Sequence, residues 1–167
     1  MSDLSNTYLF KALDNYPYDL PETIEALNYA LSYDDKNPIA LCLMGKIYAE
    51  QLKDFDAARY YYEEALSVKP DALDVIPNLI RVMIWSEDFN DALKLIEYAL
   101  NIKGSDKGNL WYDSAIVHEH KLNYKKSLKC LKKAKQFGFN SDFISFIETN
   151  EKRIKDKMPK KRKKKNK

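Results

Sequence analysis

The chain has 167 residues, of which 45% are hydrophobic and 32% are charged, and its formal net charge is +3. This apolar content suits one compact domain or one short repeat array with a buried core, and it excludes disorder throughout the chain. Only four glycines and six prolines are present, too few for the many tight turns of an all-β protein. We therefore predict an all-α fold.

The first ten residues, MSDLSNTYLF, contain early acidic and polar side chains and no long apolar run. This stretch resembles neither a secretory signal nor a membrane span. We expect the protein to stay inside the cell and to have no membrane partner. The first predicted helix covers about residues 4–14 and stops at Tyr16 and Pro17.

A second kind of helix occurs four times, at shifts of 35, 34 and 35 residues. Apolar and small residues fill the same slots in every copy, which is the signature of a repeat architecture. The residues in register are Leu20, Thr23, Leu27, Ala30 and Leu31; Phe55, Ala58, Tyr62, Ala65 and Leu66; Phe89, Ala92, Ile96, Ala99 and Leu100; and Tyr124, Ser127, Leu131 and Ala134.

Each copy follows another helical stretch, whose apolar residues lie three and four positions apart. After the weak helix at 4–14, these partner helices are predicted at about 38–50, 74–85 and 109–120. The repeating unit is therefore a helix, a tight turn and a second helix. We predict units at about 4–34, 37–70, 71–104 and 107–138.

The second unit contains Leu41, Met44, Gly45, Tyr48, Ala58, Tyr62 and Pro70. These residues resemble the tetratricopeptide pattern W-x2-L-G-x2-Y, then A-x3-F, then a closing Pro. The fourth unit keeps Trp111 but has Ser114 and His118 where Leu and Tyr are usual. The resemblance covers three good repeats and a degenerate N-terminal one. It implies a right-handed α-α superhelix, or solenoid, of antiparallel helix pairs, in which the first helix of each pair lines a concave groove.

Residues 140–157 begin with an N-cap candidate, Asn140 or Ser141, and continue with apolar residues on one side. We predict a helix that caps the C-terminal end of the solenoid, which then spans residues 1–157. The tail at 158–167, MPKKRKKKNK, has no apolar face, and its charges repel one another. We expect this tail to be disordered.

The sequence contains no GxSxG motif, no glycine-rich phosphate loop and no HExxH motif. Cys42 and Cys130 have no nearby Cys or His partner, so we expect buried, reduced thiols. His118 and His120 point about 200° apart on a helix, so they cannot readily share a metal ion. We predict no enzyme activity, no cofactor and no metal site.

The resemblance implies that side chains beside the core stripe of the first helices face a ligand in the groove. The predicted function is therefore a non-enzymatic scaffold or adaptor that binds a peptide or protein segment. Acidic ligand groups would contact the basic and amide side chains, and Trp85 and Tyr112 would supply rigid aromatic surface. The alternative is that Trp85 packs against its own neighbours and the basic side chains are only solvated. The predicted binding residues are Leu43, Lys46, Asn78, Arg81, Trp85, Tyr112 and Asp113.

Charge is divided unevenly along the chain. Residues 1–120 contain 10 Lys and Arg against 21 Asp and Glu, and residues 121–167 contain 18 against 4. The basic end predicts, as an alternative function, binding of nucleic acid or another polyanion. A solvated helix surface and a solubilising tail are the competing interpretations. The predicted polyanion-binding residues are Lys125, Lys129, Lys132, Lys160, Lys161, Arg162 and Lys163.

Two further expectations follow from this charge. The stretch PKKRKKK resembles a nuclear import signal, so a nuclear location is the alternative to the expected cytoplasmic one. Docking of the acidic repeats of one molecule on the basic end of another would give weak homo-oligomers.

Overall fold

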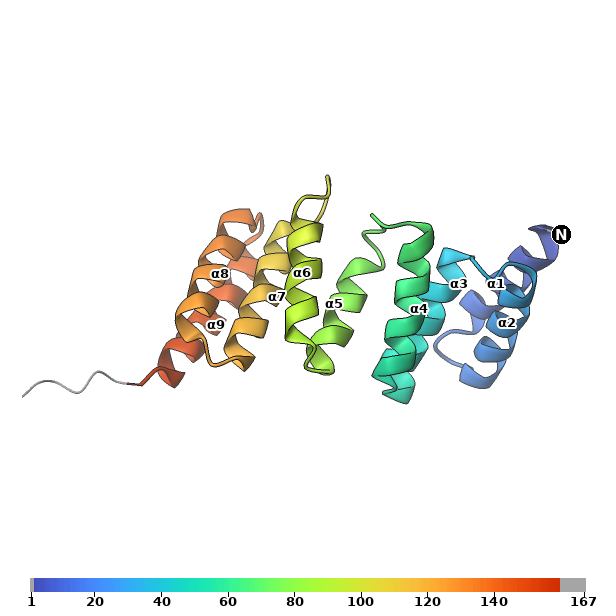
Figure 1. Ribbon diagram of the computed structural model, residues 1–167, viewed down its shortest axis with the longest axis horizontal. Helices are drawn as coiled ribbons and strands as arrows, with labels where there is room; N and C mark the ends of the chain where they lie inside the picture. Colours follow the sequence, from blue (N-terminus) through green and yellow to red (C-terminus); the bar gives the residue numbers. More distant parts are fainter. Residues whose placement is uncertain (1, 160–167) are drawn as a thin grey trace, which may run out of the picture. The chain divides into compact units, whose positions relative to one another are not determined.

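The computed structural model describes residues 2–159, with side chains from residue 4 onward. Within this range the regular elements are helices joined by short turns, and no strand occurs (Figure 1). The predicted all-α class is therefore confirmed. The elements are α1 (Ser2–Asn15), α2 (Leu20–Tyr33), α3 (Pro38–Ile47), η1 (Tyr48–Leu52), α4 (Phe55–Val68), α5 (Ile76–Trp85), α6 (Phe89–Leu100), α7 (Lys107–His120), α8 (Tyr124–Phe137) and α9 (Ser141–Lys157).

The helices form two compact units, one up to Asp91 and one from Ala92 onward. In the first unit α1 packs on α2, α2 on α3, α3 on α4 and α4 on α5. In the second unit α7 packs on α8, and α8 packs on α9. No helix within residues 2–159 has the length and hydrophobicity that are needed to cross a membrane.

Side-chain caps fix the starts of several helices. In each case a carboxylate or amide oxygen accepts a hydrogen bond from a backbone N–H of the first turn, which would otherwise lack a partner. Such a cap typically stabilises a protein by about 1 kcal/mol relative to alanine. Asn140 caps α9 by accepting from the Phe143 N–H at 2.7 Å. The other caps are Asp19, Asn37, Asp54 and Asp106.

The turn inside a helix pair recurs with the repeat period. Lys53, Glu87 and Leu122 have φ angles of 57°, 62° and 57°. These positions follow one another at 34 and 35 residues, the same shifts that relate the helices. A left-handed residue ends the first helix of the pair, as is common at helix C-termini. The structure therefore repeats in its backbone as well as in its side-chain pattern.

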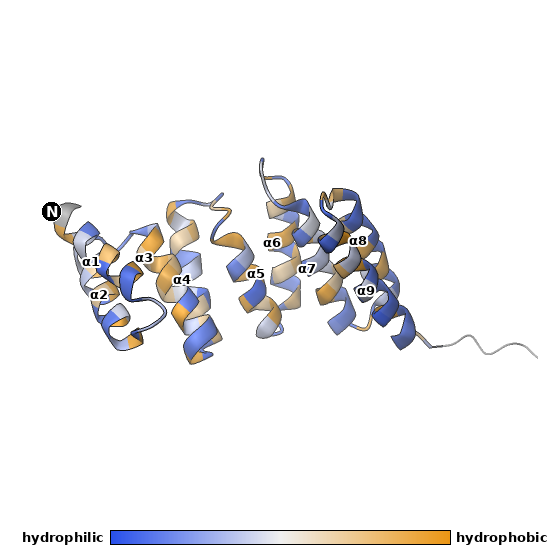
Figure 2. Cartoon of the chain, turned by 180° about the vertical axis from the view of Figure 1, so that it is seen from behind, coloured by the Kyte–Doolittle hydropathy of each residue, from blue (hydrophilic) through white to orange (hydrophobic). Residues whose placement is uncertain are grey.

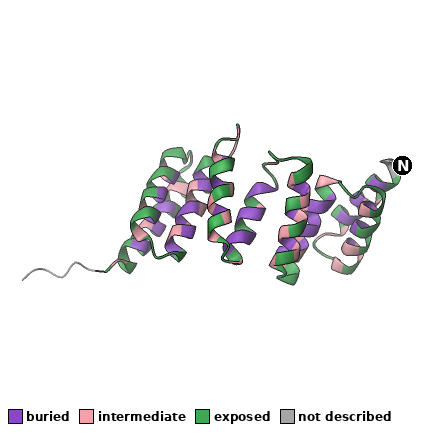
Figure 3. Ribbon diagram, viewed as in Figure 1, coloured by how far each residue is buried: buried purple, intermediate pink, exposed green. Residues whose placement is uncertain are grey.

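Each unit has its own hydrophobic core, and buried residues lie on the inner sides of the packed helices (Figure 3). Figure 2 shows polar and apolar residues on opposite sides of several helices, which is typical of helices that bury one face. The first core contains Leu9, Ala12, Ala26, Leu27, Ala30, Ala40, Leu43, Met44 and Ile47. The second contains Ala115, Cys130, Leu131, Ala134, Ile147 and Ile154.

Small polar residues replace the usual core side chains in the second unit. Ser127 lies fully buried and its hydroxyl donates to the Ala115 carbonyl at 2.8 Å. The Ser114 hydroxyl lies 3.4 Å from the Cys130 sulfur. These contacts satisfy buried polar groups that would otherwise destabilise the core. They explain how α7 and α8 tolerate serine at positions where the repeat pattern favours Leu and Ala.

Candidate peptide-binding surface

In the first unit, one set of polar and aromatic side chains gathers from four segments of the chain. Helix α3 contributes Lys46 and then widens into the π-helical turn η1, which contributes Glu50. π-Helical turns are rare and frequently occur at functional sites. We call the set the Glu50 cluster, and it consists of Tyr16, Lys46, Glu50, Lys53, Arg81 and Trp85.

The Glu50 carboxylate lies at the centre of this cluster. It accepts a hydrogen bond from the Tyr16 hydroxyl at 3.4 Å. Its other oxygen lies 3.9 Å from a guanidinium nitrogen of Arg81. The Lys46 ammonium is 5.3 Å from the centre of the Tyr16 ring, within the range of a cation–π contact. The loop after α1 is therefore connected to η1 and α5 through the Glu50 carboxylate, and to α3 through the Tyr16 ring.

Trp85 forms the other half of the cluster at the end of α5. The Arg81 guanidinium lies 6.0 Å from the indole centre and the Lys53 ammonium lies 5.8 Å from it. The Phe55 ring packs beside the indole at 5.6 Å with a tilt of 39°. Even so, 43% of Trp85 stays exposed. An aromatic side chain held by neighbours on one side and open on another is a good contact point for a ligand.

The cluster carries three cationic side chains and one carboxylate. The Arg81–Glu50 separation of 3.9 Å is longer than a hydrogen bond, and half of the Arg81 side chain is exposed. The guanidinium therefore keeps donors that can bind a ligand carboxylate in the two-pronged geometry that arginine favours. The surface can hold an acidic group beside an apolar one.

Two neutral residues interact electrostatically with members of the cluster, the buried Tyr62 and the partly exposed Cys42. The predicted buried thiol is therefore confirmed for Cys130 but not for Cys42. Burial raises the pKa of the Tyr62 hydroxyl well above its ordinary value. Burial is also the main reason that the pKa of the Cys42 thiol is raised to about 11, with a further contribution from Asp74 and an opposing one from Lys46. Cys42 therefore keeps its proton at neutral pH and is a poor nucleophile.

Comparison of the sequence with known protein families identifies the repeat family of this chain. Residues 38–142 match the model described as the TT21 fifth ARM repeats domain. The chain belongs to this family of helical repeats. Among curated proteins, none matches this repeat domain.

Solved structures share the fold of the repeat domain at low sequence identity. The MamA protein is 14% identical, with a TM-score of 0.73, over 82% of this chain and 74% of that chain. MamA from residue 41 to the end, from Desulfovibrio magneticus RS-1, is 16% identical with a TM-score of 0.74, over 93% and 92%. The N-terminal domain of stress-induced protein-1 (STI-1) from C. elegans is 14% identical with a TM-score of 0.58, over 67% and 92%. These likenesses show a shared helical-repeat fold.

Three of the predicted peptide-binding residues of the repeat domain, Lys46, Arg81 and Trp85, lie together in the Glu50 cluster. Asn78 lies one turn before Arg81 on α5, but its amide group donates to the Asp74 carbonyl at 2.8 Å. Leu43 requires a correction, because it is only 7% exposed and belongs to the core of the first unit. Helix α3 is hydrophobic on more than one side, so an offset from its main stripe does not make Leu43 a surface residue.

Two further predicted residues, Tyr112 and Asp113, lie on α7 in the second unit. Tyr112 packs against Phe146 of α9 with ring centres 4.9 Å apart. Burial raises the pKa of its hydroxyl. The Tyr112 ring therefore contacts α9. Asp113, the next residue in the chain, is partly buried.

The sequence prediction did not include Tyr16 or Lys53 in the binding set. Tyr16 lies in the turn after α1, where no periodic pattern indicates the direction of a side chain. Lys53 reaches Trp85 because it adopts the left-handed conformation that ends η1. Its alignment with Glu87 and Leu122 is the only signal in the sequence that this position is a special turn residue.

The predicted polyanion-binding residues fall into two groups. Lys125, Lys129 and Lys132 are exposed on α8. The others, Lys160, Lys161, Arg162 and Lys163, lie outside the described residues. On the adjoining α7, His118 is partly buried, and its Nδ1 has no hydrogen-bond partner among residues 2–159.

Proposed function

We propose that this repeat domain is a non-enzymatic interaction scaffold, and that the Glu50 cluster binds a protein segment with acidic side chains. The half-exposed pair of Arg81 and Trp85 supports the proposal. A ligand carboxylate would bind Arg81, with Lys46 and Lys53 adding positive charge on either side. An apolar ligand side chain next to that carboxylate would cover the exposed part of Trp85. Buried tryptophans and arginines carry much of the energy at protein interfaces.

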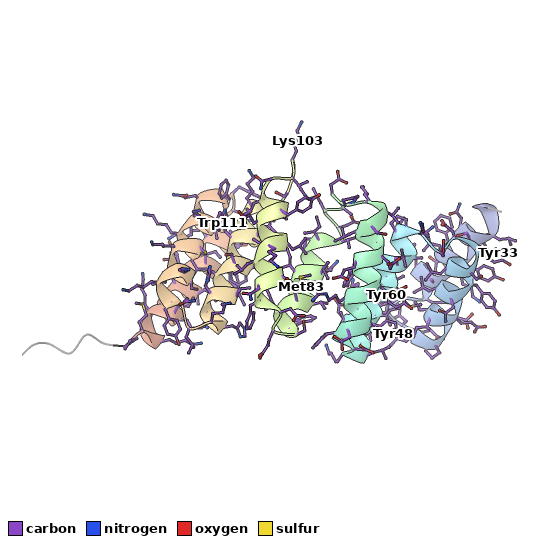
Figure 4. All side chains as sticks on the ribbon, viewed as in Figure 1. Tyr33, Tyr48, Tyr60, Met83, Lys103 and Trp111 are labelled. Atoms are coloured by element: carbon purple, nitrogen blue, oxygen red, sulfur yellow. The ribbon has the colours of Figure 1, made fainter. Side chains whose placement is uncertain are left out.

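Arg81→Glu combined with Trp85→Ala tests this assignment. The double variant reverses one charge and removes the aromatic surface, so it should lose most captured partners in affinity purification with mass spectrometry. The matched control is Lys69→Glu with Tyr60→Ala, which makes the same kinds of change at exposed positions of α4 and just after it (Figure 4). Both variants should keep the wild-type helicity by circular dichroism. If the Arg81/Trp85 variant recovers the same proteins as the control, the surface assignment is wrong.

We propose that the helix pairs are tetratricopeptide repeats. The left-handed turn residues at shifts of 34 and 35 support this proposal, as do the buried small residues of the repeat pattern. The small positions Gly45, Ala58, Ala65, Ala92, Ala99 and Ala134 are all buried.

The non-enzymatic role is part of this proposal. Cys42 keeps its proton at neutral pH and is therefore a poor nucleophile. We keep a cytoplasmic location as part of the proposal, with the nucleus as the alternative indicated by PKKRKKK.

A further inference from the structure

The outer face of α8 is a row of lysines. Lys125, Lys129 and Lys132 follow one another at intervals of four and three residues, so they lie on one side of the helix. The opposite side is buried and consists of Ser127, Cys130, Leu131 and Ala134. The row rises about 10 Å along the helix axis. That length corresponds to about three nucleotides at the spacing of one strand in a duplex.

The three lysines of this row have no ionic partner among the described residues, unlike Lys135 of the same helix. Within residues 2–159, Lys125, Lys129 and Lys132 make no ion pair or hydrogen bond. Lys135, on the flank toward α9, pairs with Glu148 at 2.8 Å. Helix α8 itself contains no acidic residue. The lysine row is therefore a concentrated positive charge available to an external polyanion.

An exposed aromatic side chain comes after the lysine row in the sequence. Phe139 comes two residues after α8 ends and is 88% exposed. Phe137, in the last turn of α8, is also exposed, and the Lys107 ammonium lies 5.8 Å from its ring centre. Lysines that follow a phosphate backbone, together with aromatic rings on which bases stack, are the combination that binds single-stranded nucleic acid.

We propose that the lysine row of α8 and Phe139 form a binding site for single-stranded nucleic acid. This site goes beyond the peptide-binding function and lies on the other compact unit. A membrane surface fits less well, because a helix that binds in the lipid interface exposes an apolar face. The apolar face of α8 is buried against its neighbours.

The pKa of His118 on α7 can be used to detect binding at this site. Burial lowers its pKa, and repulsion from Lys126 of α8 and Lys121 lowers it further. The neighbouring carboxylate of Glu119 is paired with Arg153 and Lys157 of α9. Phosphates bound along α8 would offset the repulsion from Lys126, so binding should raise the pKa of His118.

The test uses the full chain and a labelled oligouridylate, with binding measured by fluorescence anisotropy across a salt series. Lys125→Gln, Lys129→Gln and Lys132→Gln together should weaken binding roughly tenfold at low salt and reduce the log–log salt slope by about 2. The control is Lys36→Gln, Lys69→Gln and Lys103→Gln, which removes three exposed lysines elsewhere. Lys103 extends from the loop after α6 (Figure 4). The control should change the slope little.

A second pair of variants tests the stacking contact. Phe139→Ala should weaken binding several-fold without changing the salt slope, and Tyr18→Ala, which removes an aromatic ring that is 92% exposed, should not weaken it. By NMR, the oligouridylate should raise the pKa of His118 in the wild type but not in the α8 triple variant.

Three results would overturn the proposal. The first is equal loss of binding in the two triple-lysine variants, which would assign binding to net charge alone. The second is oligouridylate binding that leaves the His118 pKa unchanged. The third is binding of phosphatidylserine vesicles, but not of oligouridylate, through the α8 lysines, since that result would identify a membrane surface.

Discussion

Gly45 of α3 and Tyr62 of α4 lie in such close contact that no side chain fits between them. A Cβ atom built on Gly45 would lie 2.8 Å from Cε1 of the Tyr62 ring, and the ring atoms Cδ1 and Cγ would lie 2.9 and 3.1 Å away. Tyr62 is only 1% exposed, so its ring has no free space to move into. The spacing of the two helices therefore depends on the absence of a side chain at position 45.

Gly45→Ala should destabilise the first unit. Overpacking a dense core costs roughly 1 to 3 kcal/mol, and the better helix propensity of alanine offsets up to about 1 kcal/mol of this. Chemical denaturation followed by circular dichroism measures the effect. In a Tyr62→Leu background the added methyl group should cost less, because the smaller side chain leaves room for it. An equal cost in both backgrounds would show that the Tyr62 ring is not the obstacle.

Core packing of this kind could largely be predicted from the sequence. Repeats place the same side-chain volumes in the same slots, so the register of Ala58, Tyr62 and Ala65 with their counterparts indicates burial directly. All three are buried as the alignment predicts. Of the three tyrosines in the run RYYYEEAL, only Tyr62 is buried, and Tyr60 is exposed.

The binding surface was only partly predictable, for a physical reason. The helix pattern indicates which side chains leave the core, but not which loop side chains reach them. The contacts of Glu50 with Tyr16, and of Lys53 with Trp85, depend on a turn after α1 and on the left-handed end of η1. Glu119 presents the opposite case, because a charged residue at a buried position follows from no hydrophobic pattern.

Leu122→Gly should stabilise the second unit. Leu122 adopts a φ of 57° while 71% of the residue is exposed, so its side chain contributes little to compensate for the unfavourable backbone. Relief of a left-handed conformation is worth roughly 1 to 2 kcal/mol, and the greater entropy of unfolded glycine removes about 0.5 to 1 kcal/mol of that gain. We expect a net increase of up to about 1.5 kcal/mol in the free energy of unfolding.

Leu122→Ala is the matched control for this prediction, because it removes the exposed side chain but keeps the Cβ atom. It should leave the denaturation midpoint nearly unchanged. If alanine and glycine stabilise the unit equally, the gain comes from loss of the exposed leucine and not from the backbone.

Cys42 should react slowly with thiol reagents. With a pKa of about 11, its thiolate fraction at pH 8 is about one in a thousand. Alkylation at pH 8, followed by peptide mass spectrometry, should be at least about a hundredfold slower than for free cysteine, whose pKa is about 8.5. The rate should rise as pH increases toward 11.

Asp74→Asn removes one cause of the raised pKa of Cys42 and should accelerate labelling, whereas Asp71→Asn should not. Equal rates in the two variants would contradict the role of Asp74.

Glu119 joins α7 to α9 and should make stability depend on pH. Its carboxylate accepts hydrogen bonds from Arg153 and from Lys157, the latter at 2.7 Å. Burial alone would raise the pKa of this carboxyl and is the largest single influence, but the contacts with Arg153 and Lys157 together outweigh it, so the pKa is lowered. The folded state therefore binds a proton at this site less readily than the unfolded state does.

Because the pKa of Glu119 is lower in the folded state than in the unfolded state, the ion pairs stabilise the fold at pH values above the ordinary glutamic acid pKa of about 4.3. Their contribution is lost as the pH falls through the lower, folded-state value. At pH 7, Glu119→Gln should reduce the free energy of unfolding by about 1 to 2 kcal/mol, a modest cost because Arg153 and Lys157 are half exposed and can be solvated. The difference in unfolding free energy between Glu119→Gln and wild type should shrink in acid.

Glu148→Gln, which removes an exposed partner of Lys135, should show a much smaller effect. A Glu119→Gln deficit that is constant from pH 7 to the acid limit would mean that this variant acts through packing, not through the charge.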